Sequence, residues 1–261
     1  MNILEEIVAT RKRDLRLQKE ILPMDRLVKE IDYERNILSL PDFLRDKGRS
    51  GIIAEFKRRS PSRGVINETA KLEEVVAGYC SNRVSAVSVL TEPAYFGGST
   101  DDLRIAGEHC DVPLLRKDFI IDPWQLYEAR ASGADAILLI AAVLGRKMVA
   151  ELSETASQLG LKVLLEVHSE RELETISPFI DVIGVNNRDL ETFRVDIDLS
   201  LRLVHHLPTD LARISESGID SAEDIKSLRA AGYDGFLIGD YFMRQSDPAQ
   251  ALKQLTLLTA V

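Results

Sequence analysis

Two charged residues, Glu55 and Lys57, interrupt an otherwise apolar segment of the chain. The segment 51–58 reads GIIAEFKR, and its apolar, partly β-branched character is typical of a buried strand. Side chains alternate between the two faces of a strand, so Glu55 and Lys57 share a face with Ile53, and Phe56 points the other way. Alone, the two charges form an ion pair, but beside further charges they would supply an acid and a base.

Further polar residues stand at the ends of other short apolar segments. They are Lys117 in 113–118, Glu166 in 162–167, Asn186 in 182–187 and Glu216 in 211–217. Two lysines and three carboxylates at close quarters hold one another ionised, and they also shift individual pKa values toward neutral pH. Such a set provides a general acid and a general base. A purely structural charge network is the alternative, although buried charges are costly unless they are paired.

Short apolar segments alternate with longer amphipathic segments from residue 51 onward. The expected strands are 51–58, 86–92, 113–118, 136–141, 162–167, 182–187, 211–217 and 235–240. Eight strand–helix units predict an α/β fold of the (β/α)8 type, a TIM barrel with its active site at the carboxyl ends of the strands. An open doubly wound sheet is the alternative, but RRSPSRG after the first strand is not the glycine-rich phosphate loop of such sheets.

Residues 1–50 fall outside this alternation. They contain two segments with helical spacing of apolar residues, MNILEEIVATRKRDLRLQKE and MDRLVKEIDYE, followed by the short LPDFLRDK. We therefore predict an N-terminal helical extension over 1–50 and a catalytic barrel over 51–261, which together form one domain. The extension is expected to cover the bottom or rim of the barrel and to help cover the substrate.

Composition excludes several classes of partner. The 261 residues carry a net charge of −9, which disfavours nucleic acid and anionic membrane surfaces. No apolar segment approaches the ~20 residues of a membrane span, and the N-terminus lacks the apolar core of a signal peptide. The two cysteines, Cys80 and Cys110, fall in apparent helices and are expected to be reduced thiols of a cytoplasmic protein. The four histidines show no ligand spacing, so no metal site is predicted.

The ends of the seventh and eighth strands suit a phosphate group. Ser217-Gly218 and Gly239-Asp240 stand there, and barrels often bind phosphate through backbone N–H groups of these loops. The carboxylate of Asp240 would repel phosphate, so we expect only its backbone N–H to be used, with the side chain pointing away. The segment 58–64, with its charges and its proline between serines, is expected to be a mobile lid over the substrate.

Seven motifs in the same order resemble one family. They are IAEFKRRSPSRG (53–64), SVLTEPAYFGGS (88–99), PLLRKDFIID (113–122), LLEVHSE (164–170), IGVNNRDL (183–190), ISESGI (214–219) and FLIGDYFM (236–243). Together they resemble indole-3-glycerol phosphate synthase, over nearly the whole chain and including the N-terminal helices.

The resemblance implies a reaction that needs no cofactor. The family converts the phosphosugar 1-(2-carboxyphenylamino)-1-deoxyribulose 5-phosphate to indole-3-glycerol phosphate, with loss of carbon dioxide and water, in tryptophan biosynthesis. By resemblance, Lys117 is the general acid of ring closure and Glu166 the base. Lys57 binds the substrate carboxylate and is a second candidate for the acid of dehydration, so the assignment of the two lysines to the steps stays open. Glu55 and Glu216 orient the lysines and the substrate hydroxyls.

The resemblance also implies binding residues. Asn186 and Arg188 position the substrate. Ser217, Gly218 and Gly239 match phosphate-site positions, with Ser60 as an additional contact. The wall around the anthranilate ring is matched by Phe96, Phe119 and Leu139. The family usually has serine or glutamate where this chain has Asp240, which leaves a side-chain contact there in doubt.

Two other functions are weighed against this one. Another phosphosugar-handling barrel, such as a phosphoribosyl isomerase, typically uses a carboxylate or thiol pair as acid and base, and Lys57 and Lys117 argue against it. A binding module without activity would be expected to lack Lys57, Lys117 or Glu166, and all three are present. We expect a monomer.

Overall fold

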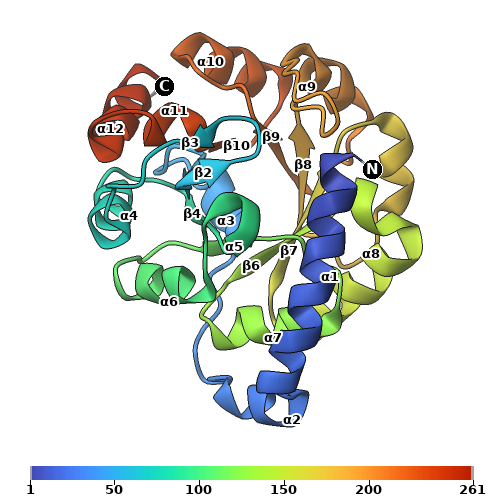
Figure 1. Ribbon diagram of the computed structural model, residues 1–261. Coiled ribbons are helices and arrows are strands. Elements are labelled where there is room, and N and C mark those ends of the chain that lie inside the picture. Colours follow the sequence, from blue (N-terminus) through green and yellow to red (C-terminus); the bar gives the residue numbers. More distant parts are fainter. Residues whose placement is uncertain (1, 260–261) are drawn as a thin grey trace.

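Eight parallel strands close into a barrel in the computed structural model, which describes residues 2–259 (Figure 1). In chain order they are β1 (Ile52–Phe56), β4 (Ala86–Leu90), β5 (Leu114–Lys117), β6 (Ala136–Ile140), β7 (Lys162–Val167), β8 (Val182–Asn186), β9 (Ala212–Glu216) and β10 (Gly235–Ile238). β1 pairs with both β4 and β10, which closes the ring. The predicted TIM barrel is therefore confirmed, and the doubly wound alternative is wrong.

Helices surround the barrel and fill most of the connections between strands. They are α4 (Leu72–Cys80), α5 (Pro93–Phe96), α6 (Thr100–Glu108), α7 (Pro123–Ala131), α8 (Ala141–Gln158), α9 (Asp198–Leu203), α10 (Ala222–Ala231), α11 (Asp240–Met243) and α12 (Pro248–Thr259). The 3-10 helices η2 (Glu170–Thr175) and η3 (Val204–His206) complete the connections around β8 and β9. A capping box starts α10, with Ser221 accepting from the backbone of Asp224, and Gly232 ends it in the left-handed conformation.

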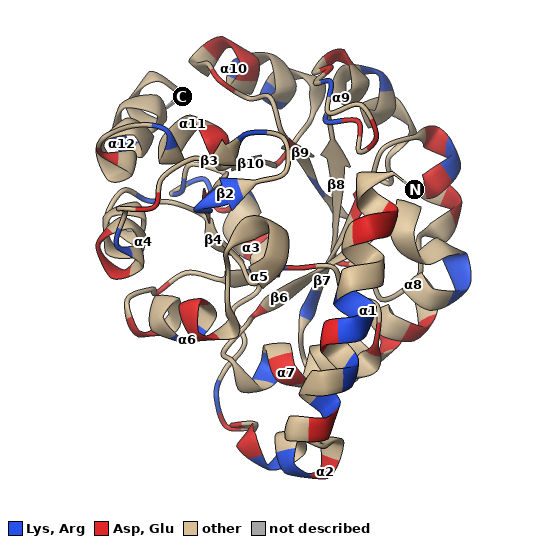
Figure 2. Cartoon of the chain, viewed as in Figure 1, with Lys and Arg blue, Asp and Glu red and all other residues tan. Residues whose placement is uncertain are grey.

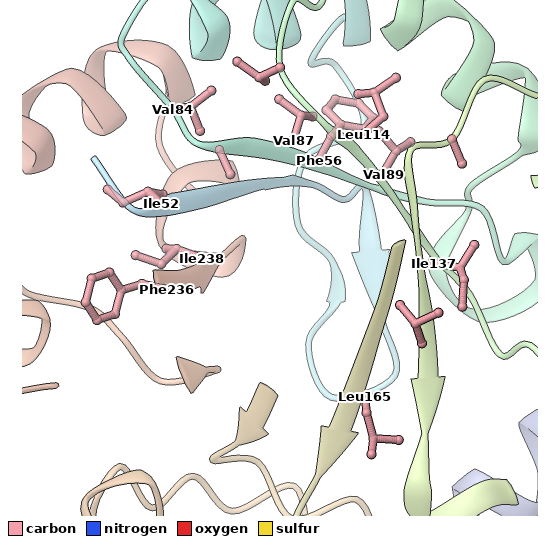
Figure 3. Packing of buried hydrophobic residues seen from close by; sticks show 14 of the residues in the cluster. Ile52, Phe56, Val84, Val87, Val89, Leu114, Ile137, Leu165, Phe236 and Ile238 are labelled. Atoms are coloured by element: carbon pink, nitrogen blue, oxygen red, sulfur yellow. The ribbon is translucent and has the colours of Figure 1, made fainter. Parts of the chain in front are cut away.

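Alternation along the strands separates two cores. Side chains such as Phe56, Val87 and Leu165 point outward and pack between the barrel and its helices (Figure 3). The opposite set, including Ile53 and Leu164, fills the inside of the barrel. The same inner face carries a polar residue at the carboxyl end of β1, β5, β7, β8 and β9, so the apolar core positions the site.

The N-terminal extension contacts the barrel at both ends. It comprises α1 (Ile3–Ile21), α2 (Met24–Leu27), η1 (Val28–Glu30) and α3 (Leu40–Arg45). Leu40 and Leu44 of α3 join the inner core and close the barrel at the amino ends of the strands. In Figure 1, α1 crosses in front of the barrel from the N-terminus down toward α2, and Arg11 of this helix binds Asp118, next to the end of β5, at 2.8 Å.

The two cysteines lie close together but occupy different environments. Cys80 ends α4, as predicted, whereas Cys110 is not helical, because α6 ends at Glu108 and His109 is its C-cap. Their sulfur atoms are 3.0 Å apart and both are free thiols.

Charges of both signs are spread over the outer helices (Figure 2). Within residues 2–259, no helix is long and apolar enough to cross a membrane.

Candidate active site

A cavity of about 160 Å³ opens at the carboxyl ends of the strands. It is lined by all but one of the site residues predicted from the sequence: Glu55, Lys57, Ser60, Phe96, Lys117, Phe119, Glu166, Asn186, Arg188, Glu216, Ser217, Gly218, Gly239 and Asp240. These residues come from distant parts of the chain, and strand parity explains their convergence, because each strand residue among them belongs to the inner face.

Leu139 is the exception, and the place in the apolar wall that the resemblance implied for it is wrong. It is fully buried in the outer core, between β6 and the helices. Its neighbours Leu138 and Ile140 line the cavity instead. All residues of β6 are apolar, so the strand offers no polar residue that would mark its inner face and correct the assignment.

Lys117 lies at the centre of the charged part of the cavity. Its Nζ forms a close ion pair with Glu216 and lies 3.2 Å from Oε2 of Glu166. Burial alone would lower the pKa of Lys117, but the charges of Glu216 and Glu166 outweigh it and raise this pKa, which keeps the ammonium group protonated.

The two carboxylates that share Lys117 differ in their proton affinity. Burial raises the pKa of Glu216 to about 7, against the attraction of Lys117 and with the help of the neighbouring Glu166 charge. Burial also tends to raise the pKa of Glu166. The interaction with Lys117 and, more weakly, that with His168 outweigh burial and lower this pKa. Glu166 is therefore the carboxylate that is held ionised and ready to accept a proton.

Lys57 forms a second charged centre on the other side of the cavity. Its Nζ lies 2.9 Å from Glu55 and 2.8 Å from Asp240. Burial tends to lower the pKa of Lys57, but the charges of Glu55 and Asp240 outweigh this effect and raise it. Glu55 and Lys57 thus share one strand face, as the alternation predicts.

The Asp240 side chain points into the cavity, contrary to the expectation that it points away. Its carboxylate lies 2.8 Å from Lys57, 3.0 Å from Arg63 and 3.4 Å from Arg188. Burial tends to raise the pKa of Asp240, but Lys57 and the two arginines outweigh it and lower this pKa. The expected repulsion of phosphate neglected these three cations. Two of them come from the segment 53–64 and the third is Arg188, and all three lie around the carboxylate.

Glycines bring the backbone close to the end of the cavity that holds Asp240. Ser217 and Gly218 both have positive φ, 67° and 73°, so the chain turns sharply after β9. A Cβ on Gly239 would lie 3.0 Å from Cβ of Glu55, which leaves room only for glycine. Arg188 and the exposed N–H groups of this turn make the end suitable for an anion.

The opposite part of the cavity is apolar. The rings of Phe96 and Phe119 lie 6.2 Å apart between centroids, at an interplanar angle of 41°. Ile3, Leu4 and Ile7 of α1 also line the cavity. The extension therefore covers the site directly, but the helical spacing of these residues could not distinguish this role from packing on the barrel.

A buried ion network anchors the segment that carries Lys117 and Phe119. Asp118 accepts from Arg11 of α1 at 2.8 Å, from Arg116 at 2.9 Å and from Thr91 at 2.7 Å. The charges of the two arginines overcome the effect of burial and lower the pKa of Asp118. The sequence reasoning missed this network, and its only local signal was the pair of charges, Arg116 and Asp118, on either side of Lys117 in the motif PLLRKDFIID.

The segment 58–64 forms a small hairpin of β2 (Arg59–Ser60) and β3 (Gly64–Val65). Arg58 binds Asp102 with two contacts, of 2.7 and 2.9 Å, and Arg59 donates to the carbonyl of Pro93 at 2.8 Å. The segment that we expect to be a mobile lid is therefore a hairpin, and Arg58 and Arg59 at its base are bound to Asp102 and Pro93.

The sequence reasoning also missed His168, which it considered only as a metal ligand. Its Nε2 lies 3.4 Å from Oε1 of Glu166. Among residues 2–259, no group of three or more His, Cys, Asp or Glu side chains is arranged to hold a metal ion.

Comparison with known proteins identifies the family. The family model described as indole-3-glycerol phosphate synthase matches residues 4–255. The chain belongs to the indole-3-glycerol phosphate synthase family. It is thus a carboxy-lyase of tryptophan biosynthesis, as its motifs predict.

Several relatives support the assignment to indole-3-glycerol phosphate synthases. The chain is 48% identical over 252 residues to the indole-3-glycerol phosphate synthase of Bacteroides thetaiotaomicron, and the match covers 97% of this chain and 96% of the relative. It is 43% identical over 258 residues to that of Salinibacter ruber, covering 98% and 95%. Among solved structures, thiamine phosphate pyrophosphorylase from Pyrococcus furiosus aligns with a TM-score of 0.59 at 18% identity, over 83% of this chain and 97% of that one, which shows a shared fold only.

Proposed function

We propose that this cavity closes the indole ring of 1-(2-carboxyphenylamino)-1-deoxyribulose 5-phosphate, with Lys117 as general acid and Glu166 as general base. The observation that carries the proposal is the position of Lys117, which contacts Glu166 and Glu216 within the same buried cavity. An acid and a base that share one substrate-sized space serve a reaction in which protons are both given and taken.

The cavity offers a separate environment for each part of this substrate. The anthranilate ring fits the apolar part, against Phe96 and Phe119. The phosphate fits the other end, where Arg188 and the turns at Ser217-Gly218 and Gly239 gather. Lys57 lies near that end and binds an anionic group of the substrate once its pairing with Asp240 is given up.

The residues then act in sequence on the bound substrate. The aryl carbon attacks the C2′ carbonyl, and Lys117, which is held protonated, gives the oxygen its proton. Loss of carbon dioxide restores the aromatic ring. In the final step a lysine protonates the departing hydroxyl, and Glu166, which is held ionised, takes the proton that the forming double bond releases.

Fluorescence of the indole product tests this assignment. The wild-type protein is expected to form indole-3-glycerol phosphate from the synthetic substrate without added cofactor, and Lys117→Ala is expected to form none within the sensitivity of the assay. Lys147→Ala is the matched control, because Lys147 lies on the surface with a side chain that is 88% exposed. Near-normal kcat in a folded Lys117→Ala protein would contradict the general-acid role, and inactive wild-type protein would contradict the reaction itself.

We further propose that residues 1–50 and the barrel over 51–261 fold as one domain and that the protein is a cytoplasmic monomer. The buried contact of Arg11 with Asp118 and the cavity residues of α1 support a single folding unit. Light scattering of the purified chain tests the monomer, and a single unfolding transition in calorimetry tests the single domain.

A further inference from the structure

His168 lies immediately behind the residue proposed as general base. It follows the end of β7, two positions after Glu166, and its side chain is 13% exposed. Nε2 is 3.4 Å from Oε1 of Glu166, and the other oxygen of that carboxylate is 3.2 Å from Lys117. His168 does not line the cavity, so any effect on the reaction must pass through Glu166.

A second carboxylate holds the imidazole from the other side. Nδ1 of His168 lies 3.6 Å from Oε2 of Glu172 in η2. Glu172 is itself fixed, because it accepts from the backbone N–H of His168 at 2.9 Å and from the hydroxyl of Ser169 at 3.0 Å. The ring is therefore held between two carboxylates, each of which favours its charged form.

The surroundings of His168 are strongly acidic. Glu166 and Glu172 face it directly, and Glu216 and Asp189 add further negative charge, while Lys117 is the nearby cation on the far side of Glu166. Burial tends to lower the pKa of His168, but the contact with Glu172 and the charges of both glutamates outweigh burial and raise it. These contacts favour the positively charged form of the imidazole.

Glu166 has two cationic neighbours, and one of them changes during the reaction. Lys117 is shared with Glu216, and in the proposed mechanism it gives its proton to the substrate. From that moment the positive charge of Lys117 no longer holds Glu166 ionised. His168 contacts the opposite oxygen and gives up no proton in this mechanism.

We propose that His168 is a positioning residue that orients Glu166 and keeps it ionised while Lys117 is deprotonated. This inference rests on the proposed function of Glu166 as the general base. Glu172 completes the arrangement by holding the imidazole in place.

His168→Gln tests the inference, since glutamine keeps a polar side chain but cannot be charged. The expected result is a kcat about 10-fold lower, a KM within about 2-fold of the wild-type value, and an acid limb of the kcat–pH profile moved about one unit to higher pH. His206→Gln is the matched control, because His206 also pairs with a carboxylate, that of Glu170 at 3.3 Å, but its side chain is 50% exposed. A purely structural role would lower Tm and leave the acid limb in place, and that outcome would overturn the inference.

Glu172→Gln and NMR titration provide a second test that does not depend on the stability of the first variant. The pKa of His168 is expected above 6.5 in the wild-type protein and lower in Glu172→Gln. A wild-type value at or below 6.5 would overturn the inference.

A double-mutant cycle separates the inference from the proposed function on which it rests. In Glu166→Gln, adding His168→Gln should lower kcat by less than 2-fold, because the carboxylate that it supports is gone. If Glu166→Gln slows turnover and His168→Gln alone does not, only the inference fails. If Glu166→Gln leaves kcat unchanged, the proposed role of Glu166 fails first.

Discussion

Gly184 is expected to be essential for activity although it carries no side chain. It lies in β8 and faces the inside of the barrel, opposite the carboxylate of Glu216. A Cβ on Gly184 would meet Oε1 of Glu216 well inside van der Waals contact and would lie 3.1 Å from Cδ1 of Leu164. Gly184→Ala therefore forces the Glu216 carboxylate to move, and with it the ion pair with Lys117.

The structure sets the size of the effect. Ordinary contact with the new methyl group requires a shift of Glu216 by roughly 1 Å, and a displacement of ~1 Å at a catalytic group costs about 10²-fold in rate. Overpacking of the inner core costs about 1–3 kcal/mol of folding free energy. For a chain of this length the corresponding fall in Tm is roughly 2–12 °C, so the variant is expected to remain folded at 25 °C.

The assay is the steady-state fluorescence of indole product at 25 °C, with Tm measured on the same sample. Gly107→Ala is the control: Gly107 lies in α6, where a Cβ would make only an ordinary contact of 3.6 Å with Leu114. That variant should keep its kcat and gain about 0.5–1 kcal/mol of stability. Adding Glu216→Asp to Gly184→Ala shortens the carboxylate side chain, so the two changes together should cost less than the sum of their separate effects.

A Gly184→Ala protein with wild-type kcat would refute the reasoning, because it would show that the position of Glu216 does not affect the acid at Lys117. A variant that loses activity only in proportion to its unfolded fraction would also refute it.

Two further predictions concern the charged groups of the cavity. Glu166→Gln should lower kcat at least ~10²-fold, because general acid–base catalysis is lost, and Tm should change little. A smaller loss of kcat in steady-state assays would assign Glu166 a supporting role. Asp240→Ser should strengthen competitive inhibition by inorganic phosphate about 10-fold, because removing the carboxylate releases Lys57 and Arg188 for the anion. An unchanged or weaker inhibition constant in Asp240→Ser would show that Asp240 instead holds the cations in the positions that the anion needs.

Much of the fold followed from the sequence because parallel barrel strands are marked by local patterns. The predicted and observed strands differ by at most two residues at either end, since β-branched apolar segments bounded by polar residues define them. Glu55 and Lys57 were placed on the inner face by alternation alone. Leu139 was placed by resemblance alone, and because β6 is apolar throughout, alternation offered no reference point that would have shown the wrong face.

The unpredicted inward turn of Asp240 depends on contacts between distant segments. Asp240 follows the last strand, where alternation ends, and the cations that turn its carboxylate inward come from elsewhere in the chain. Local spacing carries no information about such pairs. His168 is a different case, because its partners Glu166 and Glu172 are only two and four residues away, and the turn from β7 into η2 brings both carboxylates against its ring.

The pairing of charges also explains how an acidic protein can bind an acidic substrate. Lys57 and Arg188 are both paired with Asp240 in the ligand-free protein, so these side chains are oriented before the substrate arrives. An incoming phosphate competes with the Asp240 carboxylate for cations that are already in place, instead of gathering free cations from solvent. Lys117 is paired instead with two carboxylates that are both buried, which keeps its ammonium group charged for the proton transfer that we propose.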